Sequence, residues 1–220
     1  MTDIADAYLI DPSVVDRVVV VAALGTYTAP NGAMNPPNGE LDPWADWIVA
    51  QVFQYIQVSA FYDQTGDVTA AEQQLRASSG AFDEIGAATS ATTHRAFLAE
   101  VVVRLGRLEE AEELAQQVAA EAARDEVITQ VLWRCALARI RAREGSPGEA
   151  LELAAEARSL LPHAEFPQLS IRTLTAAAEA SAAADDGAEV ERLLAEARKI
   201  AEAKGAVASL AQLEAVRVAG

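Results

Sequence analysis

The chain has 220 residues, and its 33 Asp and Glu side chains outnumber its 17 Lys and Arg, so its formal charge is −16. A field of that sign repels phosphate groups, which disfavours nucleic acid and anionic membranes as direct ligands. Hydrophobic residues make up 51% of the chain but aromatic residues only 5%. The apolar content is rich in alanine, which favours an all-α protein of closely packed helices over a sheet.

The N-terminal residues and the cysteine content predict a cytoplasmic protein without a membrane partner. The opening MTDIADAYLIDP is acidic where a secretory signal is basic, and the run VVVVAAL is far shorter than the roughly 20 residues of a membrane-spanning helix. The single Cys135 cannot form an internal disulfide, and it lies in a predicted helix beside Leu132 and Ala136. We therefore expect a buried, structural thiol.

Residues 1–42 differ from the rest of the chain and are predicted to form an N-terminal helix and a loop. Asp11 and Pro12 suit the start of a helix, although the β-branched run VVVV favours a strand almost equally. An irregular loop rich in Pro, Asn and Gly follows at 25–42, where the N-G and N-P-P sequences are turn signals. Long loops of this kind are either functional or disordered.

Residues 43–218 are predicted to form an array of helical hairpins. Glycines that suit tight turns recur at nearly even intervals of roughly 40 residues, a period typical of stacked helical units. At a fixed distance before each glycine is a small side chain, as expected where two helix backbones approach closely. The turn glycines are Gly66, Gly106, Gly145 and Gly187, and the small residues are Ser59, Ala99, Ala138 and Ala180.

Four hairpins and one final helix account for this region. In these helices apolar residues recur at spacings of three and four, so that one face of each helix is buried. Gly86 and Gly205 are expected to end second helices. The predicted hairpins are 43–64 with 69–85, 92–105 with 108–123, the stretch 127–162, and 168–184 with 189–203, followed by a capping helix at 207–218.

The third hairpin combines a turn glycine, small residues and a closing proline, namely Ala138, Gly145, Ala150, Ala154, Ala157 and Pro162. This pattern resembles the tetratricopeptide repeat, although the spacing here exceeds the roughly 34 residues of that repeat, so we expect longer helices. The stretches VITQVLWR, RAREGSPGEALELAAEA and IAEAKGAVASLAQLEA are similar to the helical-repeat tails of actinobacterial transcriptional regulators and cyclase-like proteins. The resemblance covers residues 68–218. It implies a tetratricopeptide-like αα-hairpin superhelix of about four hairpins plus a C-terminal capping helix.

The sequence predicts no catalytic activity, no cofactor and no metal site. It contains no metal-ligand spacing, no phosphate-binding glycine loop, no nucleophile elbow and no CxxC motif. The two histidines, His94 and His163, lie far apart in the sequence. A helical enzyme would require separate carboxylates such as Asp63 and Glu100 to converge beside a histidine, which makes it the most remote alternative.

Charged residues on the predicted first helices form the candidate binding site. The tetratricopeptide resemblance implies that first helices line a concave groove. Positions two, six and eleven residues before the turn glycines of the second and third hairpins are mostly arginines, which bind carboxylates through paired hydrogen bonds. Alternatively, these arginines are solvated or are neutralised by glutamates of the adjoining second helix. The candidates are Arg95, Glu100, Arg104, Arg134, Arg139 and Arg143.

These features together predict a non-catalytic protein-interaction module. Its partner would be a protein or peptide in the concave groove, with an acidic or C-terminal segment as the favoured chemistry. The resemblance implies the sensor or regulatory part of a bacterial regulator. The alternative is a small-molecule or peptide receptor with a pocket between hairpins, lined by Tyr55, Tyr62, Phe97 and Trp133. A homo-oligomer is compatible with either function.

Overall fold

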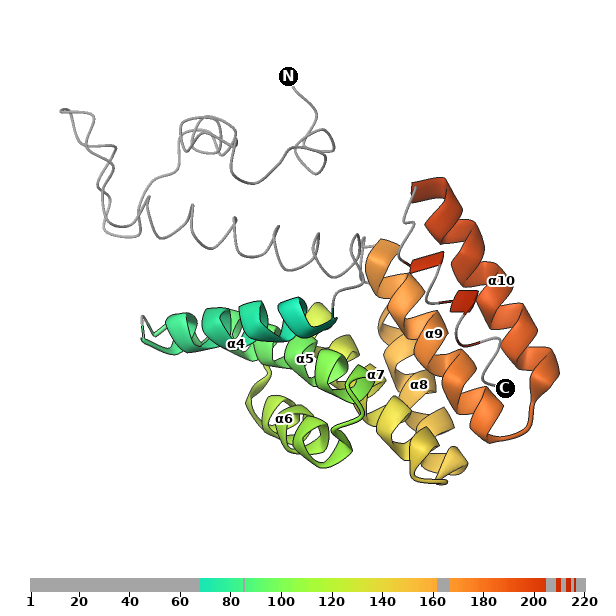
Figure 1. Cartoon of the computed structure of the whole chain (residues 1–220), viewed down its shortest axis with the longest axis horizontal. Coiled ribbons are helices and arrows are strands. Elements are labelled where there is room, and N and C mark those ends of the chain that lie inside the picture. Colours follow the sequence, from blue (N-terminus) through green and yellow to red (C-terminus); the bar gives the residue numbers. More distant parts are fainter. Residues whose placement is uncertain are drawn as a thin grey trace, which may run out of the picture. The chain divides into compact units, whose positions relative to one another are not determined.

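The computed structural model describes residues 68–84, 86–161 and 167–204, together with residues 209, 210, 213, 214 and 216 (Figure 1). All of them belong to one compact unit, Phe61–Gly220. Within these residues the regular structure is helical and no strand occurs, which confirms the predicted all-α class for this part of the chain. The predicted N-terminal segment 1–42 and the first helix of the first hairpin lie outside the described residues.

Seven helices make up the described part of the chain. Their bounds match the predicted hairpins closely except at the start of α5, which lies before the predicted Thr92. Because Ala87 provides no side-chain cap there, the sequence carries no capping signal. The helices are α4 (Val68–Glu84), α5 (Ala88–Arg104), α6 (Leu108–Glu121), α7 (Val127–Arg143), α8 (Pro147–Leu160), α9 (Pro167–Ala183) and α10 (Gly187–Lys204).

The helices pack in an order that follows the chain. α5, α7 and α9 lie against one another in succession, α6 packs against both α5 and α7, and α8 packs against both α7 and α9. α4 packs on α5, and α10 packs on α9. Figure 1 shows this succession from α4 to α10. We call α5, α7 and α9 the inner helices, because each contacts several neighbours, and α4, α6, α8 and α10 the outer helices.

Inner and outer helices differ in how much of their surface is buried. In α7 the residues from Thr129 to Ile140 are buried, apart from Trp133 and Arg134. The outer helices α6 and α8 bury a single face at spacings of four and three residues. This face is nearly all alanine, which allows their backbones to approach the inner helices closely. Its residues are Ala111, Ala115 and Val118 in α6 and Ala150, Ala154 and Ala157 in α8.

Two apolar clusters form the core of the described helices. The first is centred on α7, where Leu132 belongs to a group that includes Val118 of α6 and Leu169 of α9. The second joins α9 to α10 and is covered by Leu213, which is 1% exposed, together with Leu210. Both leucines belong to the segment 207–218, which the sequence predicts to cap the array, while Val207 lies outside the described residues.

Most of the predicted core residues are buried in the structure. In α5, Leu98, Val101 and Val102 are at most 2% exposed, as the apolar spacing predicted. The same spacing predicts burial of Phe97 in α5 and of Leu114 in α6, but both residues are only partly buried in the structure. Phe97 packs at the edge of the α7 cluster, with the guanidinium of Arg172 5.3 Å from its ring centre.

A residue with a positive φ angle lies between each inner helix and the outer helix that follows. Gly106 and Gly145 have φ of 79° and 77°, as their predicted role in the turns requires. In the last turn the residue is Asp185, with φ of 58°, so the assignment of this turn to Gly187 was wrong. Gly187 is instead the first residue of α10. With Asp185 in its place, the three turns are more evenly spaced along the chain than the glycines are.

These turns share one hydrogen-bond pattern. The amide after the positive-φ residue donates to a carbonyl five residues earlier, which is the Schellman arrangement that closes a helix C-terminus. The same pattern ends α4 at Gly86, whose φ is 73°, and this confirms the predicted role of Gly86. The bonds are Ala87 to Phe82 (2.9 Å), Arg107 to Val102 (3.2 Å), Ser146 to Arg141 (2.9 Å) and Asp186 to Ser181 (3.0 Å).

The connection from α6 to α7 is built differently. Ala122 has an extended backbone, with φ of −67° and ψ of 129°, so α6 ends without a left-handed residue. The amide nitrogen of the Gln130 side chain donates to the carbonyl oxygens of Ala122 and Ala123, at 3.2 and 3.0 Å. Gln130, which is 9% exposed, thus provides a donor for the Ala122 carbonyl at the end of α6 and a second donor for the Ala123 carbonyl, which also accepts from the Glu126 amide.

Substitution of two glycines by alanine separates the real turn from the wrongly assigned one. A Cβ atom at either Gly145 or Gly187 would meet nothing within 4 Å, so only the backbone conformation differs between them. We expect Gly145→Ala to lower the free energy of unfolding by about 1–2 kcal/mol, because its φ is positive. Gly187→Ala should cause no loss. Urea unfolding followed by circular dichroism measures both, and equal losses would contradict the assignment of the turn to Asp185.

Candidate functional site

Two of the six candidate residues meet in the interior of the inner-helix layer. Glu100 of α5 is 0% exposed, and its Oε1 accepts a hydrogen bond from Nη1 of Arg139 on α7 at 2.5 Å. The other oxygen, Oε2, accepts from Nη1 of Arg172 on α9 at 2.8 Å. One buried carboxylate therefore holds all three inner helices together. Because Glu100 and Arg139 are buried, neither faces a partner in this conformation.

The charge network continues from Arg139 to α9. Its Nε donates to Oε1 of Glu179 at 3.0 Å, and its Nη2 donates to the carbonyl oxygen of Arg172 at 3.1 Å. Glu100, Arg139 and Glu179 occupy the same position relative to the positive-φ residue of their own turn. Equivalent positions on consecutive inner helices thus carry charges of alternating sign. We call Glu100, Arg139, Arg172 and Glu179 the buried charge network.

This network accounts for the buried charge of the inner helices. Removing an ion from water costs several kcal/mol, roughly repaid only when its partners and hydrogen bonds are well placed. Glu100 has an arginine on each oxygen, and Arg139 makes hydrogen bonds through three of its nitrogens. The arrangement stabilises one particular order of α5, α7 and α9, because any other order would leave these groups uncompensated.

Arg143 and Arg104 lie near the C-terminal ends of α7 and α5. Arg143 is the one candidate whose residue is exposed, with 39% of its side chain accessible. Its Nη1 donates to the carbonyl oxygen of Val103, and its Nη2 is 3.6 Å from Oε2 of Glu179. Arg104 is partly buried, one turn after Glu100 on α5. Arg143 is thus tied to α5 through Val103, while its ion pair with Glu179 at the edge of the buried charge network is long.

Arg95 and Arg134 point away from the other candidates. They lie five positions before Glu100 and Arg139, which corresponds to about 140° around an α-helix. Arg95 pairs with Asp83 at the end of α4 and, at 3.0 Å, with Glu121 at the end of α6. The six candidates therefore do not form one continuous positive strip.

Arg134 shows the neutralisation that the sequence left as an alternative. Its Nε donates to Oε2 of Glu156 on the adjoining outer helix α8 at 2.9 Å. Its guanidinium carbon also lies 4.0 Å from the centre of the Trp133 ring, and its Nη1 donates to the Gln130 side chain at 2.6 Å. For Arg139 and Arg143 the compensating carboxylates come instead from the inner helices.

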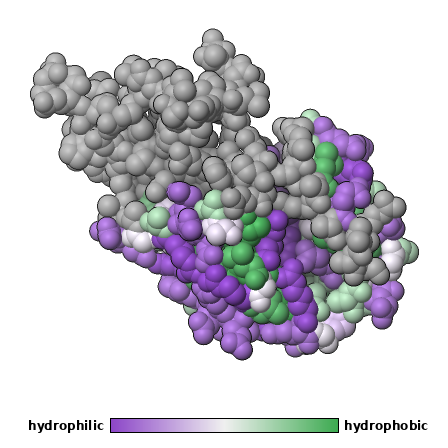
Figure 2. All heavy atoms as spheres, in the orientation of Figure 1, coloured by the Kyte–Doolittle hydropathy of each residue, from purple (hydrophilic) through white to green (hydrophobic). Residues whose placement is uncertain are grey.

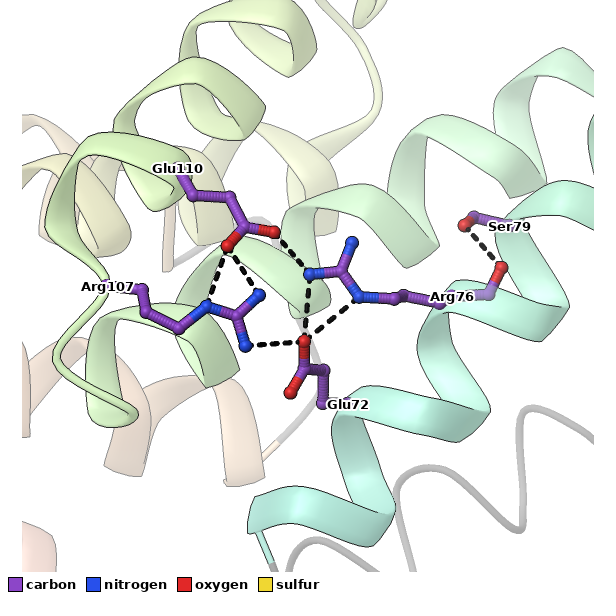
Figure 3. Close-up of polar contacts among 5 residues, drawn as sticks. All are labelled: Glu72, Arg76, Ser79, Arg107 and Glu110. Carbon is purple, nitrogen blue, oxygen red and sulfur yellow. Dashed lines mark hydrogen bonds and ion pairs between the residues drawn. The ribbon is translucent and has the colours of Figure 1, made fainter.

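A second ion cluster, which the sequence did not single out, joins α4 to the start of α6 (Figure 3). Oε1 of Glu72 accepts from Arg76 and from Arg107, both at 2.8 Å. Glu110 also contacts both arginines, with Oε2 2.7 Å from Nε of Arg107. The spacings of four in α4 and three in α6 were visible in the sequence, but the contact between the two pairs depends on the fold. We call these four residues the exposed ion cluster.

The exposed ion cluster is electrostatically weaker than the buried one. Hydrogen bonds from Arg76 lower the pKa of both Glu72 and Glu110, burial opposes the shift, and Arg107 adds to it. Both carboxylates are therefore ionised at neutral pH. Because 43% and 44% of the two arginine side chains is exposed, water and salt screen these pairs, and each contributes under about 1 kcal/mol.

Cys135 is buried, as predicted, and its thiol donates to Thr173 Oγ1 at 3.7 Å. Among the described residues, no group of three His, Cys, Asp or Glu side chains is placed to hold a metal ion. None of the described helices is long and apolar enough to cross a membrane.

Two of the four residues predicted to line a pocket between hairpins, Phe97 and Trp133, belong to the described part of the chain. Phe97 and Trp133 are partly buried against the α7 cluster, where they fill the edge of the core. Trp133 Nε1 donates to Gln130 Oε1 at 3.2 Å. Tyr55 and Tyr62 lie outside the described residues.

Comparison with known proteins found no protein-family model that matches the chain and no curated protein that matches it.

Neutralising one carboxylate in each cluster tests whether the buried charge network contributes more to the free energy of unfolding than the exposed ion cluster does. Glu100→Gln leaves the buried Arg139 and the partly buried Arg172 short of a counter-charge, so we expect the free energy of unfolding to fall by about 3–5 kcal/mol. The matched change Glu72→Gln, in the exposed ion cluster, should cost under about 1 kcal/mol. The urea concentration at the midpoint of unfolding measures these losses, provided that the slope of the free energy of unfolding against urea concentration is unchanged. Similar losses for the two variants would contradict the proposed role of the buried charge network.

The buried thiol gives the protein a predictable loss of stability in alkali. Burial, the largest cause, raises the pKa of Cys135 from 9.0 to about 12. As pH rises, the unfolded chain therefore loses its thiol proton before the folded chain does. The contribution of the neutral thiol to the free energy of unfolding is intact below pH 9.0 and is lost as pH rises toward 12. Within that window wild-type stability should fall by up to about 1.4 kcal/mol per pH unit more steeply than that of Cys135→Ala. Parallel curves for the two proteins in urea titrations would contradict this.

Proposed function

We propose that the chain is a non-catalytic protein-interaction module built as a tetratricopeptide-like array of helical hairpins. The even spacing of the turns at Gly106, Gly145 and Asp185 and their shared hydrogen-bond pattern support this proposal. So does the packing, in which α6 and α8 each lie against two successive inner helices. Its role as the regulatory part of a bacterial regulator, and its cytoplasmic location, remain predictions from the sequence.

The observation that carries the proposal is the state of Arg143. Of the six candidate residues it is the exposed one, and its ion pair with Glu179 is long, at 3.6 Å. While Nη1 stays on the Val103 carbonyl, Nη2 can exchange the distant Glu179 for a carboxylate of a partner and donate a charge-assisted hydrogen bond to it. The buried charge network then serves as the rigid base that positions Arg143. We therefore propose an acidic or C-terminal protein segment as the partner, docked at the C-terminal end of α7.

The surface of the described helices supports a polar mode of recognition. In the view of Figure 2 most of the coloured surface is polar, with an apolar strip near the centre and smaller apolar areas toward the right. Leu151, at 40%, is the single large apolar side chain exposed among the described residues. Large exposed apolar patches are the usual sign of an apolar docking site. Charge complementarity at Arg143 gives a partner orientation and specificity without such a patch.

Charge reversal at matched arginines tests the proposal. The chain is used to capture proteins from a lysate of its native host, and the captured protein is identified and purified. Arg143→Glu should weaken binding at least about tenfold, because one lost charge-assisted pair is worth about 1.5–3 kcal/mol. Arg192→Glu on α10 is the control, since Arg192 is also exposed and ion-paired, and the change in net charge is identical.

The outcomes of this comparison are distinct. Loss of binding in Arg143→Glu alone supports docking at α7. Equal loss in both variants shows that net charge and not this site governs capture, and full binding by Arg143→Glu rejects the site. Circular dichroism of each variant establishes that the helices are intact before binding is compared.

A further inference from the structure

A histidine lies in the contact between α4 and α5. The ring of His94 on α5 stacks against Phe82 on α4, with centres 4.6 Å apart and planes tilted by 51°. His94 is 4% exposed and Phe82 is 2% exposed, so this contact is closed to water. The two helices are joined by a short connection in which Gly86 has a positive φ angle. A titratable ring is thus buried beside the turn between two helices.

The start of α5 is held by side chains that bond to their own helix. Thr92 Oγ1 donates to the Ala88 carbonyl at 2.9 Å, and Thr93 Oγ1 donates to the Thr89 carbonyl at 3.0 Å. His94 Nδ1 lies 2.8 Å from the Ser90 carbonyl, so it donates when that nitrogen carries the proton. Bonds of this type bend or weaken a helix slightly. The first turns of α5 are therefore easier to disturb than its middle.

The charged groups around this contact do not favour a protonated ring. Asp83 of α4 and Glu121 of α6 both bind Arg95, the residue next to His94. Because both carboxylates are already paired with Arg95, they are not available to compensate a positive charge on the His94 ring. From α7, the hydroxyl of Thr129, an uncharged group, lies 2.8 Å from that of Thr93. Burial accordingly lowers the pKa of His94, while the Ser90 carbonyl partly opposes this.

Ion pairs and apolar side chains also link α4 to its neighbours. Asp83 of α4 pairs with Arg95 of α5, but 51% of the Asp83 side chain is exposed, so solvent screens this pair. The exposed ion cluster ties α4 to α6, but salt and water screen it. The buried side of α4 consists of Ala71, Leu75 and Phe82 together with two serines. The buried part of the contact between α4 and α5 is therefore apolar, and it includes the ring of His94 packed on Phe82.

We propose that the contact between α4 and α5 is a pH-sensitive hinge. It is closed while His94 is neutral and opens at Gly86 when the ring binds a proton. The sign follows from the lowered pKa: the separated state binds a proton at the ordinary value of 6.5, whereas the closed state resists it. Closure is fully stabilised above pH 6.5 and weakens as pH falls below it. This inference is independent of the identity of any partner.

Distances between spin labels test the hinge directly. Cys135 is buried and stays unlabelled, so cysteines introduced at exposed alanines carry the labels. Ala77→Cys on α4 with Ala155→Cys on α8 spans the hinge, and Ala120→Cys on α6 with Ala155→Cys is the reference on one side of it. From about pH 7.5 to about pH 5.5, on either side of the ordinary histidine pKa, the spanning distance should lengthen and broaden. The reference distance should not change.

Histidine variants show which residue is responsible. His94→Gln cannot bind a proton in this range, so its spanning distance should remain closed at both pH values, whereas His163→Gln should respond as the wild type does. Should His94→Gln fail to fold, His94→Phe, which keeps a ring against Phe82, replaces it. A wild-type distance that is the same at both pH values overturns the hinge, and so does a response that persists without His94.

Discussion

The carboxylate of Glu100 imposes the strongest constraint on this fold. It is fully buried, and a buried charge without partners costs several kcal/mol, so it requires cations from two other helices. Arg139 and Arg172 supply them, and Arg139 in turn requires Glu179. Each of these demands can be met only if α5, α7 and α9 lie in the observed order and register. The outer helices then pack against a layer whose geometry is already determined.

Much of the helical structure could be predicted because it depends on local spacing. Apolar residues at intervals of three and four gave the helices, and Gly106 and Gly145 gave the turns, since glycine adopts positive φ without strain. The last turn was misplaced. Its sequence contains both Asp185 and Gly187, and the usual preference for glycine pointed to the wrong one. An aspartate also tolerates the left-handed conformation, and only the packing of α10 on α9 decides between them.

Glu179 was missed because positions were counted only in the second and third hairpins, and the misplaced turn of the fourth would have led to another residue. Counting six positions back from the correct turn reaches Glu179, whereas counting from Gly187 reaches Ser181. Glu100 and Arg139 were found, but as surface groups, because a sequence does not show which carboxylate approaches which arginine. Arg95 and Arg134 were grouped with them by spacing from the turn, although their positions lie on another side of the helix. Rotation about the helix axis, and not distance from the turn, decides which side chains meet.

The alanine faces of α6 and α8 divide the surface into two parts with different freedom to change. Ala111, Ala115, Ala150 and Ala154 are buried against the inner helices, so a larger side chain there would force the helices apart. The opposite faces of the same helices point to water and carry no such restriction. Their charges can be exchanged without altering the distance between helices. Related proteins could therefore acquire new binding preferences on the exposed faces of α6 and α8 while the distances between their packed helices stayed the same.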